Sequence, residues 1–309
     1  MLRYVIKRLL LLIPTLIAVS FIVYFIVDLA PADDLDVKYG KEVSAEQLEA
    51  MREELGYNDP LVIRYGRYMA NLLKGDLGVS ARSGEPVLDL YLAKLPSTIR
   101  LTVWSVLISI VLALPLGILA ALKQNTWIDA SCTVLGLAGL SLPCFCTGLA
   151  LILLFSVKLQ ILPSYGDQYW YSIIMPAFTV GLSGVGLLLR TTRSSMLEVI
   201  RQDYLRTARA KGVSERSVIL KHALKNALIP IITIAGESFA INLGGAVVTE
   251  TVFAWPGVGR MIINAIGDRD ITLVTGSLII TTMLASIITL LVDIIYGFVD
   301  PRIKARYAK

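Results

Sequence analysis

The stretch Asp203-Tyr-Leu-Arg-Thr-Ala-Arg-Ala-Lys-Gly212-Val-Ser-Glu-Arg-Ser217 lies between two strongly apolar runs and has the pattern of two helices joined at a glycine corner. Gly212 can adopt the left-handed conformation that ends a helix, and Ser214 can cap the next helix. Val213 and Val218 have the spacing of a hydrophobic staple. We therefore predict a rigid elbow on the cytoplasmic side of a membrane protein.

The wider segment 190–228 carries nine Lys/Arg against three Asp/Glu. Such an ordered basic loop favours docking onto a soluble partner, because orientation of the chain in a membrane does not require an elbow. The alternative is a solvated loop that only obeys the positive-inside rule. The spacing of the residues leaves both interpretations open.

The composition predicts an integral membrane protein, since 55% of the 309 residues are hydrophobic and only 17% are charged. A helix of ~20 residues crosses a hydrocarbon core of ~30 Å. Six apolar runs reach that length, so we predict an all-α bundle of six transmembrane spans, at 9–29, 99–122, 131–157, 172–189, 229–249 and 271–299. The first run exceeds the length of a typical signal-peptide core, which indicates a retained helix.

The distribution of Lys and Arg predicts the orientation. With the N-terminus inside, the inner segments hold three at 1–8, one at Lys123, nine at 190–228 and four at 300–309. The short outer loops hold only three. Both termini of this multi-pass membrane protein are therefore expected in the cytoplasm. This asymmetry explains the net charge of +5 without any nucleic-acid partner.

The predicted division of the chain has three parts: 1–29 as the N-terminus and first span, 30–97 as an extracytoplasmic insertion, and 98–309 as a five-helix core. The insertion carries twelve Asp/Glu and eight Lys/Arg. Ser44-Ala-Glu-Gln47 is a capping box that opens a helix ending near Gly56. A second helix is expected from Pro60, and Pro86 opens the helix that leads into the second span.

Two acidic residues fall within the predicted membrane. An unpaired charge at the position of Glu237 would cost at least ~2.5 kcal/mol, so Glu237 should face a polar cavity or a partner, or be protonated. We consider Glu237 a candidate for the solute pathway, together with Asn242. For Asp293, near the inner end of the sixth span, a structural hydrogen bond or ion pair is expected. Three further residues are assigned structural roles in helix packing or local helix geometry: Pro230, Gly244 and Gly245.

The loop Glu250-Thr-Val-Phe-Ala-Trp-Pro-Gly-Val-Gly-Arg260 follows the fifth span. Its aromatic and proline residues could form an external gate, which makes Glu250, Phe253 and Trp255 candidates for the translocation path. An interfacial tryptophan is the simpler interpretation of Trp255.

Several kinds of site are not expected. The chain contains no G-x-x-x-x-G-K-[ST] sequence, so we predict that it does not bind ATP through a P-loop. His222 is the only histidine and has no second ligand at metal-binding spacing. The three cysteines, Cys132, Cys144 and Cys146, are expected to be small buried thiols rather than a disulfide framework. No cofactor or metal is therefore predicted for this chain.

At the level of whole motifs, the chain resembles permease subunits of ATP-binding-cassette importers in the dipeptide/oligopeptide/nickel branch. The resemblance covers nearly the whole length. It rests on the N-terminal Leu2-Arg-Tyr-Val-Ile-Lys-Arg-Leu-Leu, Gly75-Asp-Leu-Gly-Val-Ser80, Ala208-Arg-Ala-Lys-Gly212, 250–259 and Asp300-Pro-Arg-Ile303.

The family's coupling signature is Glu-Ala-Ala, three residues, Gly, nine residues and Ile-x-Leu-Pro. Alignment on Gly212 places Arg206-Thr207-Ala208 at the Glu-Ala-Ala positions and His222-Ala-Leu-Lys225 at the Ile-x-Leu-Pro positions. The chain departs from the consensus at the Glu and at the Pro, with Pro230 arriving later.

The resemblance implies that the loop 203–225 is a coupling helix seated in a groove of a cytoplasmic ATPase. Asp203, Arg206, Arg209 and Lys211 would orient this contact, and Leu205 and Ala208 would fill the groove. The remaining implied coupling residues are Tyr204, Thr207, Gly212, Ser214 and His222. The implied partners are a second homologous permease, two ATPases that bind ATP and Mg, an external solute-binding protein and the lipid bilayer.

The leading hypothesis is thus a non-enzymatic translocation subunit for di- or oligopeptides. The same architecture could import nickel, a metal chelate or a glutathione-like solute. An ion-coupled secondary carrier is the alternative from another class, although neither paired intramembrane charges nor an inverted repeat is evident. An intramembrane enzyme would need a base within the bundle, and no histidine lies there.

Overall fold

The computed structural model describes residues 2–29, 34–39, 43–244 and 246–299. Within these ranges every extended regular element is helical, and the sole β contact is an isolated bridge between Val79 and Pro86. The predicted all-α class is therefore confirmed.

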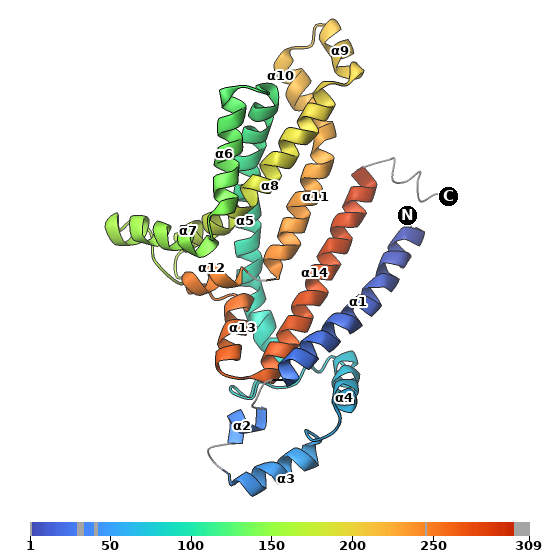
Figure 1. Ribbon diagram of the computed structural model, residues 1–309, viewed down its shortest axis with the longest axis vertical. Coiled ribbons are helices and arrows are strands. Elements are labelled where there is room, and N and C mark those ends of the chain that lie inside the picture. Colours follow the sequence, from blue (N-terminus) through green and yellow to red (C-terminus); the bar gives the residue numbers. More distant parts are fainter. Residues whose placement is uncertain (1, 30–33, 40–42, 245, 300–309) are drawn as a thin grey trace.

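The long helices run between two distinct ends of the molecule (Figure 1). One end carries the short helices α9 (Asp203–Ala210) and α10 (Glu215–Ser217). The other end carries α2 (Asp34–Tyr39), α3 (Ala45–Leu55) and α4 (Leu61–Leu73), which come from the predicted insertion. The predicted elbow and the predicted insertion thus lie at opposite ends of the bundle.

Four helical stretches in the described part of the chain are long and apolar enough to cross a membrane. They are Val87–Leu122, Trp170–Ile200, Glu215–Leu243 and Ile271–Val292. A bent helix pair from the third predicted span is a fifth candidate, and α1 (Leu2–Asp28) contributes the shorter apolar stretch Ile13–Asp28. The protein is polytopic, and the count of six spans stays a prediction.

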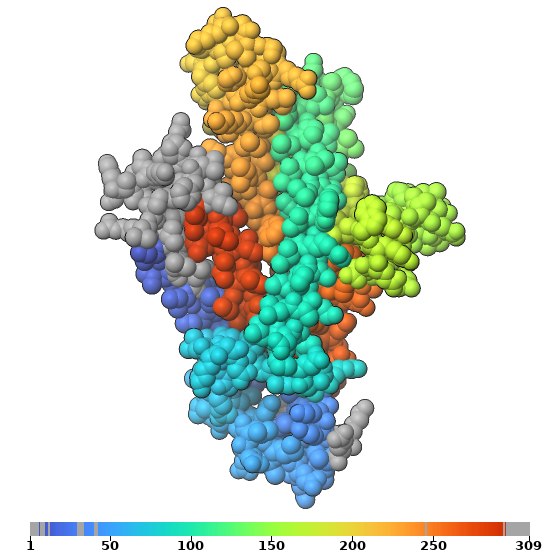
Figure 2. Space-filling model, turned by 180° about the vertical axis from the view of Figure 1, so that it is seen from behind, coloured from blue at the N-terminus to red at the C-terminus, as the bar shows by residue number. Residues whose placement is uncertain are grey.

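The third predicted span is bent rather than straight. Helix α6 (Trp127–Ser141) is followed by α7 (Cys144–Leu151) and the π-helical segment η1 (Ile152–Lys158), and the two halves meet at 96°. Leu142 is extended, with ψ 125°, because the ring of Pro143 disfavours a helical conformation in the preceding residue. As a result, α7 projects sideways from the bundle, as Figures 1 and 2 both show.

Small residues bring α5 (Val87–Leu122) and α8 (Ile174–Ile200) close together. A Cβ added to Gly117 would lie 2.6 Å from the Cβ of Thr192. The Ser109 hydroxyl donates a hydrogen bond of 2.6 Å to the carbonyl of Gly181. Such contacts are typical of helices that associate within a membrane. Helix α8, which leads into the elbow, is thereby fixed against α5.

The local signals in the insertion are largely confirmed. Ser44 and Gln47 form the predicted capping box, and Gly56 ends α3 in the left-handed conformation with φ 73°. Pro60 lies one position before α4, at its N-cap, rather than at the first helical position. Helix α5 starts directly after Pro86 and continues without interruption across the predicted domain boundary at residue 97.

The insertion is attached to the first residues of α14 (Ile271–Val299) by two buried carboxylates. Asp34 accepts hydrogen bonds from the backbone N–H of Ile271, at 2.8 Å, and from the hydroxyl of Thr272. Asp270 accepts a hydrogen bond of 2.5 Å from the Ser80 hydroxyl. Carboxylates are favourable at a helix N-terminus because the free N–H groups there carry partial positive charge. We call the helices α2 to α4 and the following loop to Pro86 the cap.

Candidate functional site

The predicted corner at the end of α9 is confirmed. Gly212 has φ 78°, and the N–H of Val213 donates a hydrogen bond of 3.3 Å to the carbonyl of Ala208. Ser214 precedes α10, where its backbone carbonyl accepts from the N–H of Val218 at 2.9 Å. No side-chain cap bond from Ser214 is found, so its contribution is through the backbone. The corner is an ordered reversal of the chain.

Leu205 fixes α9 to the rest of the bundle. Its side chain is fully buried in a cluster with Met196 of α8, and with Val218 and Ala223 of the π-helical segment η3 (Val218–Ala223). Ala208 and Val213 pack against the same cluster. The expectation that Leu205 fills a groove in a partner is therefore wrong, because this side chain belongs to the core of its own chain.

An ion pair spans the corner. The guanidinium of Arg209 donates to both carboxylate oxygens of Glu215, with Nε–Oε2 and Nη2–Oε1 distances of 3.0 Å and 2.8 Å. Asp203 and Arg206 approach to only 3.7 Å and are both highly exposed. Exposed ion pairs contribute little to stability, so the Arg209–Glu215 pair mainly defines the shape of the elbow.

A third contact closes the elbow near its base. The side-chain amide of Asn226 donates to the hydroxyl of Tyr204 at 2.7 Å and to the carbonyl of His222 at 3.2 Å. His222 is thus used through its backbone, and its side chain is exposed. Asn226 was not among the residues expected from the sequence, because an Asn in a basic loop carries no distinctive signal.

The exposed surface of the elbow is polar and mainly basic. The candidate coupling residues exposed there are Asp203, Tyr204, Arg206, Thr207, Arg209, Lys211, Gly212, Ser214 and His222. Leu205 and Ala208 lie beneath this surface as its apolar support. The structure therefore provides an ordered surface on which the side chains of Asp203, Arg206 and Lys211 are exposed to another molecule.

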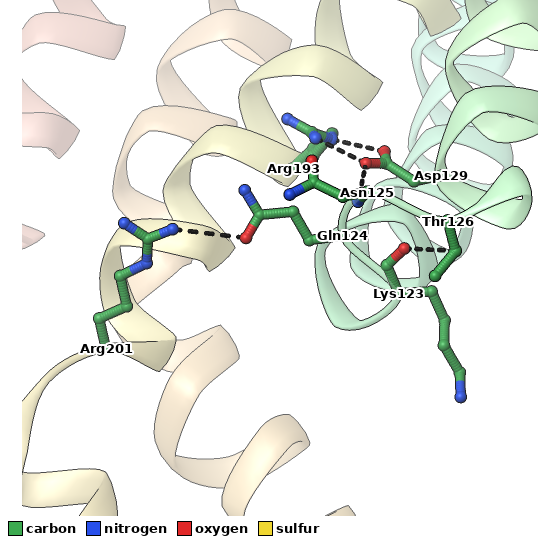
Figure 3. A network of polar contacts seen from close by, with 7 residues as sticks. All are labelled: Lys123, Gln124, Asn125, Thr126, Asp129, Arg193 and Arg201. Carbon is green, nitrogen blue, oxygen red and sulfur yellow. Dashed lines mark hydrogen bonds and ion pairs between the residues drawn. The ribbon is translucent and has the colours of Figure 1, made fainter.

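A polar clamp ties the elbow's supporting helix to the loop between α5 and α6 (Figure 3). Arg193 of α8 donates to both oxygens of Asp129 of α6, at 2.7 Å each. Asn125 has φ 61°, and its backbone N–H donates to Asp129 at 3.0 Å. Arg201 contacts Gln124 at 3.4 Å. Sequence reasoning missed this clamp, because Asp129 and Arg193 are 64 positions apart.

The loop after the fifth predicted span is organised around Glu250. Glu250 lies in α12 (Val247–Val252), which is followed by a short turn and α13 (Val258–Gly267), and its side chain is fully buried. Glu250 accepts hydrogen bonds of 2.9 Å from the Thr98 hydroxyl and from the N–H of Arg260. Its carboxylate leaves no room for a side chain at Gly257, where an added Cβ would lie 2.2 Å from Oε1.

Phe253 and Trp255 are also buried, at 1% and 0% exposure. The Trp255 indole donates a hydrogen bond of 3.0 Å to the carbonyl of Ser97, and the guanidinium of Arg100 lies 4.7 Å from the centre of the Trp255 ring. These contacts lock the loop onto the start of α5. The gate hypothesis for Glu250, Phe253 and Trp255 is not supported by this burial, and Trp255 lacks the exposed surface that is typical of an interfacial tryptophan.

The other pathway candidates lie on or near α11 (Leu224–Leu243). Glu237 is exposed, and it forms no hydrogen bond or ion pair with any described residue. Asn242 is half-buried. The structure brings neither of them to the elbow or to Glu250, so their place on a solute path stays a prediction.

The structure describes only some of the residues that were assigned structural roles. Pro230 lies inside α11 and is exposed, and Gly244 is the C-cap of that helix. Gly245 and the side chain of Asp293 lie outside the described residues.

The structure offers no ready metal centre in the described part of the chain, where no group of three or more His, Cys, Asp or Glu side chains is suitably placed. Cys132 is buried and Cys144 half-buried, as expected for small thiols, but Cys146 is exposed on the projecting helix α7. Its exposure follows from the bend at Pro143, which turns α7 away from the bundle.

Comparison with protein families covers nearly the whole chain. Residues 113–305 match the binding-protein-dependent transport system inner membrane component, and residues 1–102 match the N-terminal part of such membrane components. The chain belongs to this family. It is an inner-membrane permease component of an ATP-binding-cassette importer, in the dipeptide/oligopeptide/nickel group, and its family is one of transporters and not of enzymes. The ion-coupled carrier alternative is set aside by this membership.

Individual relatives of the permease align from end to end. The glutathione transport system permease protein GsiC of Escherichia coli O6:H1 (strain CFT073) is 40% identical over 304 residues, which cover 98% of this chain and 99% of the relative. The protein of the same name from Shigella dysenteriae serotype 1 is 39% identical over the same coverage. The permease is thus similar to complete proteins and not to one domain of them.

A solved structure shares the fold. The inward-facing MetNI methionine transporter in its CY5 native crystal form has a TM-score of 0.60 at 19% identity, and the match covers 69% of this permease and 97% of that chain. The likeness confirms the architecture of an ABC transporter permease. About a third of this permease lies outside the match and has no counterpart in that chain.

Proposed function

We propose that this permease forms half of a translocation pathway for short peptides, with the tripeptide glutathione as the leading solute. The observation that carries the solute class is the end-to-end similarity to permeases named for glutathione transport, at 39–40% identity over 98% of the chain. Nickel, a metal chelate and longer peptides are the competing solutes. The described residues hold no cluster of metal-binding side chains, which favours a peptide over a bare metal ion.

The elbow is the proposed site of coupling to cytoplasmic ATPases. Its support is geometric: Gly212 fixes the corner, Leu205 seats α9 on α8, and the Arg209–Glu215 pair spans the turn. A rigid element of this kind transmits a rigid-body movement of a partner into the bundle. The exposed charges of Asp203, Arg206 and Lys211 would orient the contact.

The proposed assembly contains this permease, a second homologous permease, two ATPases and an external solute-binding protein. ATP and Mg would be bound by the ATPases. The basic elbow end is assigned to the cytoplasm and the cap end to the outside, in keeping with the positive-inside rule. The opposite placement of elbow and cap in Figure 1 supports this orientation.

The solute is tested by uptake into proteoliposomes that contain the assembled complex, ATP inside and binding protein outside. Labelled glutathione is expected to accumulate only with ATP, and an excess of unlabelled glutathione should compete better than a dipeptide or a nickel chelate. Stronger competition by the chelate or by longer peptides would identify that compound, and not glutathione, as the solute. Accumulation without ATP would contradict the coupling.

The coupling site is tested with Gly212→Val against Gly212→Asn. Open space surrounds Gly212, so the cost of a side chain is one of backbone conformation. A β-branched residue at φ 78° costs about 1–2 kcal/mol or more, whereas Asn tolerates this conformation. We expect the Val variant to lose on the order of tenfold in ATP-driven uptake. The Asn variant should keep most of it, and both should insert into the membrane normally. Unchanged uptake by Gly212→Val would reject the elbow as the coupling element.

A further inference from the structure

A groove of about 590 Å³ lies between α6 and α8, on the elbow side of the bundle. Its apolar wall includes Val134 and Leu137 of α6 and Leu189 of α8, and its polar rim includes Arg190 and Arg193. The groove therefore changes from apolar to basic along its length. This change follows the sequence of α8, in which an apolar stretch is followed directly by the two arginines.

The rim carries one unneutralised positive charge. Arg193 is paired with Asp129, whose side chain is only 8% exposed, as Figure 3 shows. Arg190 is exposed and forms no hydrogen bond or ion pair with any described residue. The clamp thus holds Arg193 and Asp129 in place beside Arg190, and Arg190 is left available for an anion.

The α6 side of the wall is exposed on the outside of this chain. Val134 is 63% exposed and Leu137 is 37% exposed, although both lie in an apolar helix. Trp127, at the start of the same helix, is 77% exposed, which is typical of a tryptophan at the membrane–water interface. The rim of the groove therefore lies close to the headgroup level, and its wall extends into the hydrocarbon region.

We propose that this groove binds an anionic phospholipid. The headgroup phosphate would contact Arg190, and one acyl chain would lie along Val134 and Leu137. Basic pockets between membrane helices on the cytoplasmic side are suited to anionic headgroups, and guanidinium groups hold phosphates with charge-assisted hydrogen bonds. A free inorganic anion would make no use of the apolar wall, which favours a lipid as the occupant.

The proposed lipid does not depend on the transported solute. Only its leaflet, the cytoplasmic one, rests on the proposed orientation. The bound lipid would contact α8 beside the Asp129–Arg193 clamp, and thus the helix that carries the elbow.

The test uses the permease in its membrane assembly, reconstituted in nanodiscs with equal amounts of phosphatidylglycerol and phosphatidylcholine of the same acyl chains. Lipids retained on the protein are counted by native mass spectrometry. A photoactivatable phosphatidylglycerol then identifies the residues that it contacts. We expect preferential retention of phosphatidylglycerol, with cross-links at Val134 and Leu137.

Two variants and a matched control locate the site. Arg190→Gln is expected to lower the phosphatidylglycerol preference about fivefold, because one Arg near an anionic headgroup contributes on that scale. Val134→Asn should remove the cross-links in the wall. Arg216→Gln removes the same charge from an exposed position on α10, outside the groove, and should change neither result.

Equal retention of both lipids, or an Arg190→Gln variant that behaves like the wild type, would overturn the proposal. So would an assembled complex in which α6 and α8 cross-link to another protein chain and to no lipid. That result would identify the groove as a contact between subunits. A loss of preference in Arg216→Gln as strong as in Arg190→Gln would mean a diffuse charge effect and would also reject a defined site.

Discussion

At the scale of single residues, Glu250 shows how one buried carboxylate organises a loop. It binds the Thr98 hydroxyl from α5 and the N–H of Arg260, while Gly257 leaves the space that the carboxylate occupies. The sequence placed Glu250 at the start of a glycine-rich loop but could not identify Thr98 as its partner. The two residues are 152 positions apart, and a threonine within an apolar run carries no sign of its partner.

This arrangement predicts that Gly257→Ala is strongly destabilising. A methyl group there would collide with the Glu250 carboxylate, and overpacking of a buried site typically costs about 1–3 kcal/mol. We expect a lower thermal unfolding midpoint of the detergent-solubilised protein. Gly267→Ala is the matched control, because no atom lies within 4 Å of the added Cβ and the residue is already helical. Equal midpoints for the two variants would contradict the tight packing at Gly257.

At the scale of elements, glycine and proline were informative but incomplete signals. Gly212 correctly predicted the corner after α9, because the corner depends only on the left-handed backbone conformation that glycine adopts there. The burial of Leu205 within its own chain could not be predicted. It depends on packing against Val218 and Ala223 of the π-helical segment η3, and no sequence pattern indicates a π-helix there. The apolar run 131–157 predicted one span from its length alone, and the 96° bend beside Pro143 was not predicted.

The seating of α9 predicts a clear difference between two leucines. Leu205→Ala should cost about 2–5 kcal/mol of local packing, because its side chain is fully buried. Leu220→Ala, at a position 45% exposed, should cost much less. We expect limited trypsin digestion to cleave after Arg206 and Arg209 faster in the Leu205 variant than in the wild type or the Leu220 variant. Identical cleavage rates would mean that α9 is held by its ion pair and not by Leu205.

At the scale of the whole molecule, the cap and the bundle form a connected structure. The start and stop of α3 were predictable, because capping boxes and left-handed glycines act locally, whereas α2 carries no such signal and was not predicted. Their attachment to α14 was not, since Asp34 and Ser80 reach Ile271 and Asp270 from far along the chain. Figure 2 shows the cap directly against the lower end of the bundle. The insertion is thus an integral part of the permease.

The cap contact predicts a pH dependence. Burial raises the pKa of the Asp34 carboxyl above its usual value of 3.8, and the hydrogen bonds from Thr272 act in the opposite direction. The Asp34 carboxyl therefore binds its proton more tightly in the folded state than in the unfolded state. The contribution of Asp34 to stability falls as the pH rises from 3.8 through the raised pKa, and it is constant above that range.

The measurement is the thermal midpoint of the wild type minus that of Asp34→Asn across this pH range. The difference should become less favourable to the wild type as the pH rises and should then level off. Asp89→Asn, an exposed carboxyl at the start of α5, controls for the change of net charge. A difference that grows with pH would mean that the hydrogen bonds outweigh burial at Asp34.

The attachment of the cap also sets an order of events during biosynthesis. Asp34 leaves the ribosome 237 residues ahead of Ile271, the residue whose N–H it accepts. The contact of Asp34 with α14 therefore forms only after the last helix has been made, whereas α4 can pack on α1 earlier through the Arg64–Asp28 ion pair. A chain that ends before residue 271 therefore lacks the hydrogen bonds between the cap and α14, and only the finished chain has both attachments.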